Sequence, residues 1–244
     1  MKVLIACEES QTVAKAFRTR GHEAFSADIQ LCGGGCPQWH IHGDVIPYIN
    51  GDCTFQTENG DVHTIAGQWD LLIAHPPCTY MSGAGACRMY PKAGKPPDAE
   101  RLKKALSARE FFFAFVNATC EHIAIENPRP LSIVGLPEES QQIQPFQFGE
   151  PYSKLTYLWL KNLPPLKYTK VIEAYKPYVS CGTSRNKGKT DKSGVSRAGG
   201  AAKIRSKTFP GIAEAMADQW SDQISSYSGG WSRISEIFGQ VTLF

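Results

Sequence analysis

The chain has 244 residues, of which 42% are hydrophobic and 20% are charged. This length suits one large domain with a core of its own, and the composition is that of an ordinary globular protein. No apolar run is long enough to span a membrane, and the first residues lack a signal-peptide pattern, so we expect a cytoplasmic protein without membrane contact. The net charge of +3 is too small to identify a partner, and the eight cysteines show no disulfide spacing.

The first 28 residues predict a strand, a helix and a second strand. Residues 3–6 are continuously apolar, as in a buried parallel strand. Ser10 is a plausible N-cap for a helix over 11–20, and the strand over 23–27 ends at Asp28. An acid at the tip of the second strand is typical of nucleoside-binding half-sheets, where the carboxylate accepts hydrogen bonds from ribose hydroxyls.

The first turn carries acids where a dinucleotide site would need glycines. Glu8 and Glu9 precede Ser10, and carboxylates there would repel a pyrophosphate. S-adenosylmethionine has no phosphate and carries positive charge, so this turn tolerates it. Asp44 is a second candidate acid, placed to accept a hydrogen bond from an adenine amino group. The alternative is that Glu8 and Glu9 are solvated residues that favour a helix N-terminus.

Two further features precede the central strand. Cys32, Cys36, His40 and His42 are the ligand types that zinc prefers, but their spacing is unusual and the glycines between the cysteines also fit a plain loop. We therefore predict no metal and keep zinc as an alternative. Strand-like segments over 54–58 and 61–65 flank Asn59-Gly60, which predicts a hairpin with a two-residue turn.

Two apolar runs end in polar tips that are closed by proline. Residues 69–74 lead into His75-Pro76-Pro77-Cys78, and residues 122–125 lead into Glu126-Asn127-Pro128. If the two strands are parallel neighbours, the thiol and the carboxylate meet at the carboxyl edge of the sheet, where open α/β sheets bind ligands. The alternatives are an ordinary cysteine after a Pro-Pro turn and a strand-terminal acid in solvent.

The remaining chain predicts a loop over 82–97, a helix over 98–118, a strand over 154–160 and a helix over 211–220. Between 168 and 207 hydrophobic periodicity fades and basic residues dominate. A basic loop of this kind suits a phosphate backbone, although a solvated loop is the alternative. The candidate contacts there are Arg185, Lys187, Lys189 and Arg205.

In order along the chain, Pro76-Pro77-Cys78, Glu126-Asn127-Pro128 and Phe209-Pro210-Gly211-Ile212 resemble motifs of the DNA cytosine-5 methyltransferases, especially compact phage or prophage members. The resemblance implies a Rossmann-like S-adenosylmethionine-dependent methyltransferase fold, an α/β fold with a largely parallel sheet and helices on both faces. It implies a catalytic domain over 1–167 and 208–220 and a short basic DNA-contacting insertion over 168–207. The tail over 221–244 has no assigned role.

The resemblance also implies a reaction and its residues. Cys78 would add to carbon 6 of a cytosine flipped out of double-stranded DNA, and Glu126 would contact ring nitrogen 3 and the exocyclic amine. Asn127 would brace the loop formed by Pro76, Pro77 and Cys78. S-adenosylmethionine would be bound by Ala6, Cys7, Glu8, Ser10, Asp28, Ile29, Asp44, Val45 and His75. Lys154 and Thr156 join the basic residues above as candidate DNA contacts.

The sequence departs from the family pattern at several positions. Residues 7–10 replace the Phe-x-Gly-x-Gly cofactor turn, His75 replaces a glycine, and Thr79-Tyr80 stands where Gln-x-Phe is expected. Lys154 and Thr156 are the substitutes for a Gln-x-Arg-x-Arg strand. The alternatives are methylation of an exocyclic amine (N4 of cytosine or N6 of adenine), transfer of another group or action on a free nucleotide, and a catalytically inactive DNA-binding protein.

Overall fold

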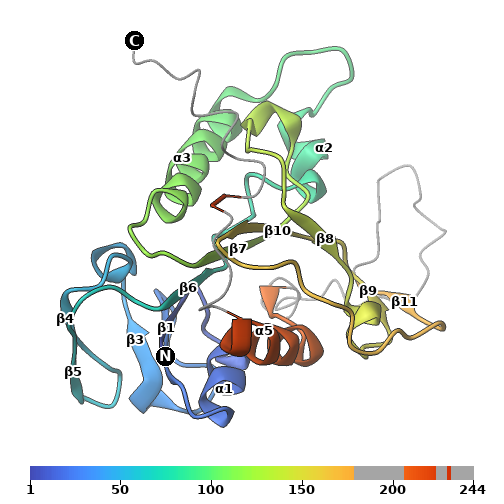
Figure 1. The fold of residues 1–244 in the computed structure, drawn as a ribbon. Helices are drawn as coiled ribbons and strands as arrows, with labels where there is room; N and C mark the ends of the chain where they lie inside the picture. Colours follow the sequence, from blue (N-terminus) through green and yellow to red (C-terminus); the bar gives the residue numbers. More distant parts are fainter. Residues whose placement is uncertain (179–205, 224–229, 232–244) are drawn as a thin grey trace.

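The computed structural model describes residues 1–178, 206–223 and 230–231, and its centre is a seven-stranded sheet in the order β3-β2-β1-β6-β7-β10-β8 (Figure 1). Neighbouring strands from β3 to β7 are parallel, β10 is antiparallel to β7, and β8 is antiparallel to β10. This arrangement confirms the predicted α/β class with a largely parallel sheet. The strands are β1 Lys2–Ala6, β2 Glu23–Asp28, β3 His40–His42, β6 Leu71–Ala74, β7 Ile123–Pro128, β8 Gln141–Ile143 and β10 Thr156–Lys161.

Helices cover both faces of the sheet (Figure 1). Helices α1 (Thr12–Thr19) and α5 (Pro210–Gln223) lie together on one face, where Phe17 and Trp220 join a hydrophobic cluster. Helix α3 (Ala99–Val116) covers the other face, where Phe112 belongs to a second cluster. The sheet is therefore buried on both sides, which explains the continuously apolar sequences of β1 and β6.

The smaller elements lie around this framework. A hairpin of β4 (Cys53–Gln56) and β5 (Val62–Ile65) packs on the α3 side through Phe55 and Ile65. Strands β9 (Tyr152–Ser153) and β11 (Lys176–Pro177) form a short parallel pair, and α2 (Ala86–Met89) precedes α3. The 3-10 turns are Pro37–Trp39, Ile46–Tyr48, Gly83–Gly85, Ser132–Val134 and Pro145–Gln147. In the described residues, no helix is both long and apolar enough to cross a membrane.

The predicted N-cap of the first helix is wrong. Gln11, not Ser10, occupies the cap position, and its left-handed backbone (φ 57°) leaves it without a side-chain capping bond. The free N–H groups are instead bound by Glu8, whose Oε1 accepts from Val13 N at 2.6 Å and whose Oε2 accepts from Ala14 N at 3.1 Å. A carboxylate reaches across the turn and satisfies two donors, which a serine hydroxyl could not do.

The hairpin is present, but its connection differs from the predicted two-residue turn. Gln56 pairs with Val62, so residues 57–61 form a five-residue loop. Thr57 N donates to Asp61 O at 2.9 Å, and Gly60 supplies a positive φ inside the loop. Other bounds shift by a few residues: the last helix extends to Gln223, and β7 continues through Glu126 and Asn127.

Candidate functional site

The two proline-terminated tips lie side by side at the carboxyl edge of the sheet. Strands β6 and β7 are parallel neighbours, with Ala74 opposite Ile125. The next residues on each strand are therefore His75 and Glu126, which begin the two predicted catalytic motifs. The sequence-based prediction that parallel pairing brings these motifs to one edge agrees with the sheet order.

Hydrogen bonds lock the two tips together. The buried Asn127 donates from Nδ2 to Pro76 O at 2.8 Å, and His75 Nδ1 lies 2.9 Å from Glu126 Oε2. His75 N also donates to Ala6 O at 2.9 Å, which ties this tip to the end of β1. Backbone hydrogen bonds of His75 and Pro76 to the ends of β1 and β7 therefore position Cys78, which follows Pro77 and is half-buried.

The segment after Cys78 turns back and is held by α3. Ser82 N donates to Cys78 O at 2.9 Å, and Arg101 Nη2 donates to Thr79 O at 2.8 Å. The Arg101 guanidinium carbon also lies 5.1 Å from the centre of the Tyr80 ring. The thiol therefore lies at the start of a tight turn whose far side is fixed by a charged side chain of α3.

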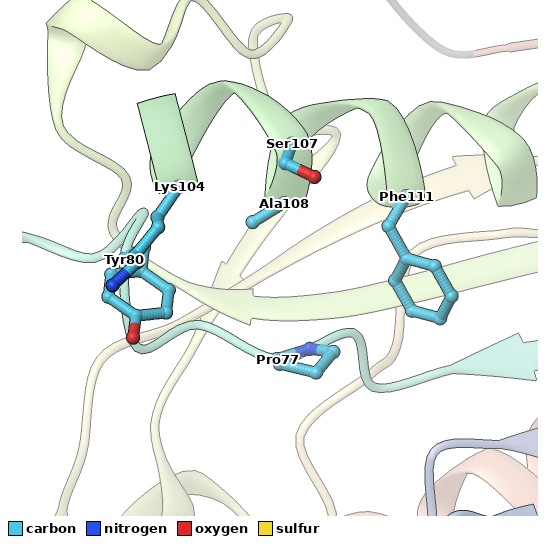
Figure 2. A pocket seen from close by; sticks show the side chains of 6 residues that line it. All are labelled: Pro77, Tyr80, Lys104, Ser107, Ala108 and Phe111. Carbon is cyan, nitrogen blue, oxygen red and sulfur yellow. The ribbon is translucent and has the colours of Figure 1, made fainter. Parts of the chain in front are cut away.

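An open hollow lies between this turn and α3 (Figure 2). The Lys104 ammonium projects from the helix over the Tyr80 ring, 5.8 Å from its centre. The other lining residues are mostly apolar, and they border the turn on the side of Pro77. The lining residues are Pro77, Tyr80, Lys104, Ser107, Ala108 and Phe111.

Glu126 is a buried carboxylate with a positive environment. Burial alone would raise its pKa, but the hydrogen bond with His75 and the positive charge of Lys154 outweigh burial and lower the pKa. Glu126 is therefore ionised near neutral pH and acts as the acceptor. The donor in the 2.9 Å bond is then His75 Nδ1, which fixes the ring tautomer.

A small hollow opens beside Glu126. Lys154 lines it from the approach to β10, and its ammonium lies 5.8 Å from the centre of the Phe209 ring at the start of α5. Three segments that are far apart in the chain thus enclose one space next to the carboxylate. The lining residues are Glu126, Lys154, Thr156, Thr208, Phe209 and Ile212.

The predicted cofactor residues gather at the ends of β1, β2 and β3. Cys7 follows β1 with a positive φ of 61°, and burial together with the negative charges of Asp28 and Asp44 raises the pKa of its thiol. Both carboxylates must therefore lie close to Cys7. Ile29 is 76% exposed directly after Asp28, which leaves an apolar side chain at this acidic edge. Ala6 and Val45 are buried there, and Ser10 is half-buried.

The interpretation of Glu8 and Glu9 as solvated residues is wrong, because they are only 4% and 6% exposed. The loop over 32–36 covers their turn. A Cβ at Gly33 would lie 2.0 Å from Glu9 Oε2, and one at Gly34 would lie 2.5 Å from Gln11 Cβ, so no larger residue fits without displacement. The glycines that suggested a plain loop therefore permit close packing of two loops.

The side chains considered above as alternative zinc ligands make other contacts. Cys32 Sγ lies 3.2 Å from Gln11 Oε1, and the two ring nitrogens of His40 bond Ser26 Oγ and Gln30 O, each at 2.9 Å. His42 Nε2 bonds Ile29 O at 3.1 Å. Within the part of the chain that the structure describes, no group of three or more His, Cys, Asp and Glu side chains could hold a metal ion.

The predicted phosphate contacts Arg185, Lys187, Lys189 and Arg205 lie outside the described residues. Sequence reasoning missed two features that the structure reveals. Gln11 is fully buried, and its amide bonds both the N–H and the carbonyl of Cys36, at 3.0 and 2.9 Å. Phe209 was noted only as part of a motif, yet it forms a wall beside Glu126. No local pattern marks a buried amide, whereas the aromatic before Pro210 was a usable signal.

No family model matches the sequence, and no curated protein matches it. Among solved structures, the fold is similar to that of a candidate DNA modification methyltransferase encoded within a prophage in E. coli, with a TM-score of 0.38 and 11% sequence identity. The similarity covers 66% of this chain and 46% of that chain, so this protein spans less than half the length of the other.

Proposed function

We propose that the protein is an S-adenosylmethionine-dependent DNA methyltransferase that acts on carbon 5 of cytosine. The observation that supports this most is the interlocking of two tips: Asn127 holds Pro76, His75 holds Glu126, and Cys78 follows on the same edge. A nucleophile and a carboxylate on adjacent parallel strands are the two groups that this chemistry requires.

Cytosine carbon 5 is a poor nucleophile until another group adds to the ring. In the proposed reaction the Cys78 thiolate forms a bond to carbon 6, and the electron pair of the 5,6 double bond moves to carbon 5 and is shared through carbon 4 with nitrogen 3. A proton or hydrogen bond at nitrogen 3, supplied by Glu126, stabilises the charge that develops. Carbon 5 would then take the methyl group of the bound cofactor, whose sulfonium leaves as a neutral thioether. Loss of the carbon 5 proton to water and breaking of the bond between Cys78 sulfur and carbon 6 would restore the 5,6 double bond and release the enzyme.

The residues at the ends of β1 to β3 fit S-adenosylmethionine better than a phosphate-bearing cofactor. Asp28 and Asp44 lie close enough to Cys7 for their charges to add to burial in raising the pKa of its thiol, and Ile29 offers an exposed apolar contact. A negative edge suits ribose hydroxyls and a cationic ligand and disfavours a pyrophosphate. When bound, this cofactor supplies an electrophilic methyl group.

The hollow beside Glu126 is our proposed position for the edge of the flipped base. Lys154 and Thr156 offer polar atoms there, and Phe209 offers an aromatic surface. This assigns Lys154 to the base pocket, close to the residue that contacts nitrogen 3, in addition to its predicted contact with DNA. A stacked base cannot reach such a hollow, so base flipping is part of the proposal.

The test uses duplex DNA that contains 5-fluorocytosine, together with S-adenosylmethionine carrying a labelled methyl group. Fluorine at carbon 5 blocks the final elimination, so the wild-type protein should form a labelled adduct that resists denaturant. Cys78→Ser should form none and should still bind the cofactor in calorimetry. Cys87→Ser is the matched control, because Cys87 is an exposed thiol on α2 nine residues away, and it should form the adduct.

Two results would contradict the proposal. An adduct with Cys78→Ser would remove the assigned nucleophile. Cofactor binding without any adduct in the wild-type protein would exclude carbon 5 as the acceptor, and product analysis for N4-methylcytosine and N6-methyladenine would then test the exocyclic-amine alternative. That alternative is less well supported here, because His75 and Cys78 occupy the positions where those enzymes carry an Asp, Asn or Ser and an aromatic residue.

A further inference from the structure

His75 stands between two buried glutamates, one at each side of the site. Its Nδ1 lies 2.9 Å from Glu126 Oε2, with the side chains of His75 and Glu126 only 8% and 10% exposed. Glu8 follows β1, and burial raises its pKa. The charge of His75 lies close enough to oppose part of this rise. Glu126 lies in β7 and Glu8 follows β1, so the two strands that flank β6 in the sheet each place a buried glutamate near this imidazole.

The second ring nitrogen of His75 has no hydrogen-bond partner among the described residues, although it is buried. A neutral ring with its proton on Nδ1 leaves Nε2 as a bare acceptor. A ring with a proton on both nitrogens would carry a positive charge and would keep the same Nδ1 contact with Glu126. The ring can thus hold one proton more than the hydrogen bond to Glu126 requires.

Glu126 by itself is poorly suited to donate a proton. Its pKa is lowered by His75 and Lys154, so the carboxyl group is ionised near neutral pH. Nitrogen 3 of cytosine nevertheless needs a proton or a donor when a thiolate adds to carbon 6. The ionised carboxylate needs a nearby source from which it can take that proton.

We propose that His75 is the proton-supplying partner of Glu126, an inference that rests on the proposed cytosine-5 function. The proton moves from His75 Nδ1 to Glu126 Oε2 along the 2.9 Å bond, which converts an imidazolium and a carboxylate into a neutral imidazole and a carboxylic acid. Rotation about the terminal carboxyl torsion, which is broad and two-fold, turns the O–H toward nitrogen 3. Glu126 then donates to the base, and the proton returns when the adduct breaks down.

His75 acts through Glu126, so it is a positioning residue rather than a catalytic residue. Its proposed role differs from a cofactor contact, the role that the family resemblance implied. It also differs from a purely structural bond, because an asparagine could donate an N–H to Glu126 but could not transfer a proton. This difference defines the informative substitution.

His75→Asn should lower kcat by about 100-fold or more, the usual scale of a lost proton transfer, while KM for DNA and the affinity for S-adenosylmethionine change less than about threefold. His22→Asn is the control, because His22 lies at the opposite edge of the sheet directly before β2, and its kcat should match the wild type. A wild-type kcat in His75→Asn would overturn the inference. Cofactor affinity at least tenfold weaker, with kcat unchanged at saturating cofactor, would assign His75 to cofactor binding instead.

A second readout does not require turnover. Nitrogen-proton correlation spectra of the histidine rings should show the His75 proton on Nδ1, and Glu126→Gln should change that resonance. A proton found only on Nε2 would overturn the inference. Failure of the proposed function would appear in the wild-type protein as absence of the fluorocytosine adduct. Failure of this inference would leave that adduct intact and would appear in the ring spectra or in the comparison of wild type with His75→Asn.

Discussion

Glu8 and Glu126 are the same residue type, both buried, and they flank the same imidazole, yet their pKa values shift in opposite directions. Burial raises the pKa of Glu8, although backbone N–H groups of Val13 and Ala14 and the charge of His75 oppose the rise. The pKa of Glu126 is lowered, because the direct bond to His75 and the charge of Lys154 outweigh burial.

The difference shows that the partner, and not the depth of burial, decides what a buried carboxyl group can do. Amide dipoles hold Glu8 in place as a helix cap without fully offsetting the loss of hydration. The hydrogen bond with His75 and the charge of Lys154 keep Glu126 ionised near neutral pH. Glu8 is therefore suited to stabilising the first turn, and Glu126 to chemistry.

The largest expected effect comes from removing the charge of Glu126. Glu126→Gln keeps the shape but can neither hold nor transfer the proton, so kcat should fall by about 100-fold or more. Single-turnover methylation of a DNA duplex measures this directly. Glu110→Gln, an exposed acid on α3, is the control and should behave as the wild type. A Glu126→Gln enzyme with normal kcat would break the comparison, because the carboxylate would then have no chemical role.

A second prediction concerns the first turn, where packing rather than charge dominates. The Cβ of Gly34→Ala would lie 2.5 Å from Gln11 Cβ and 2.6 Å from Ser10 O, so the loop or the turn must move. We expect a loss of about 1–3 kcal/mol in the free energy of unfolding, measured in urea. Gly83→Ala should cost less than about 0.5 kcal/mol, because the nearest atom to its Cβ is Arg129 O at 3.6 Å. Equal stabilities would show that the covering loop is loosely packed.

Much of the fold could be predicted from the sequence because the signals are local. The apolar runs of β6 and β7 and their terminal prolines define two buried strands and where they end, and parallel order then brings both tips to one edge. The cap of α1 could not be predicted, since it depends on a left-handed Gln11 that lets Glu8 reach the helix. The predicted length of the hairpin loop was wrong for a similar reason, because Asn59-Gly60 indicates a turn but does not set the register of the two strands.

The candidate site divides in the same way. Cys78 and Glu126 stand out in the sequence because each follows an apolar run in a recognisable motif. The bonds that connect the tips join residues 51 positions apart, and Lys154 meets Phe209 only after β10 and α5 have packed. Such contacts depend on tertiary packing and leave no periodic signal. The contact of His75 with Glu126 was equally hidden, because a histidine before Pro-Pro gives no hint of its partner.

The last prediction uses pH to separate the two glutamates. The lowered pKa of Glu126 means that its contribution to stability is present above the unfolded-state value, near 4.5, and is lost as the pH falls through the lower folded-state pKa. The raised pKa of Glu8 has the opposite sign: its folded state favours the protonated form, so stability declines as the pH rises from 4.5 through the folded-state pKa. Urea unfolding of the wild type, Glu8→Gln and Glu126→Gln across this range tests both signs. The stability advantage of the wild type over Glu126→Gln should shrink in acid, and its advantage over Glu8→Gln should shrink as the pH rises. Parallel curves for the two variants would show that both carboxyl groups titrate alike, and the partner of each would then not decide its charge.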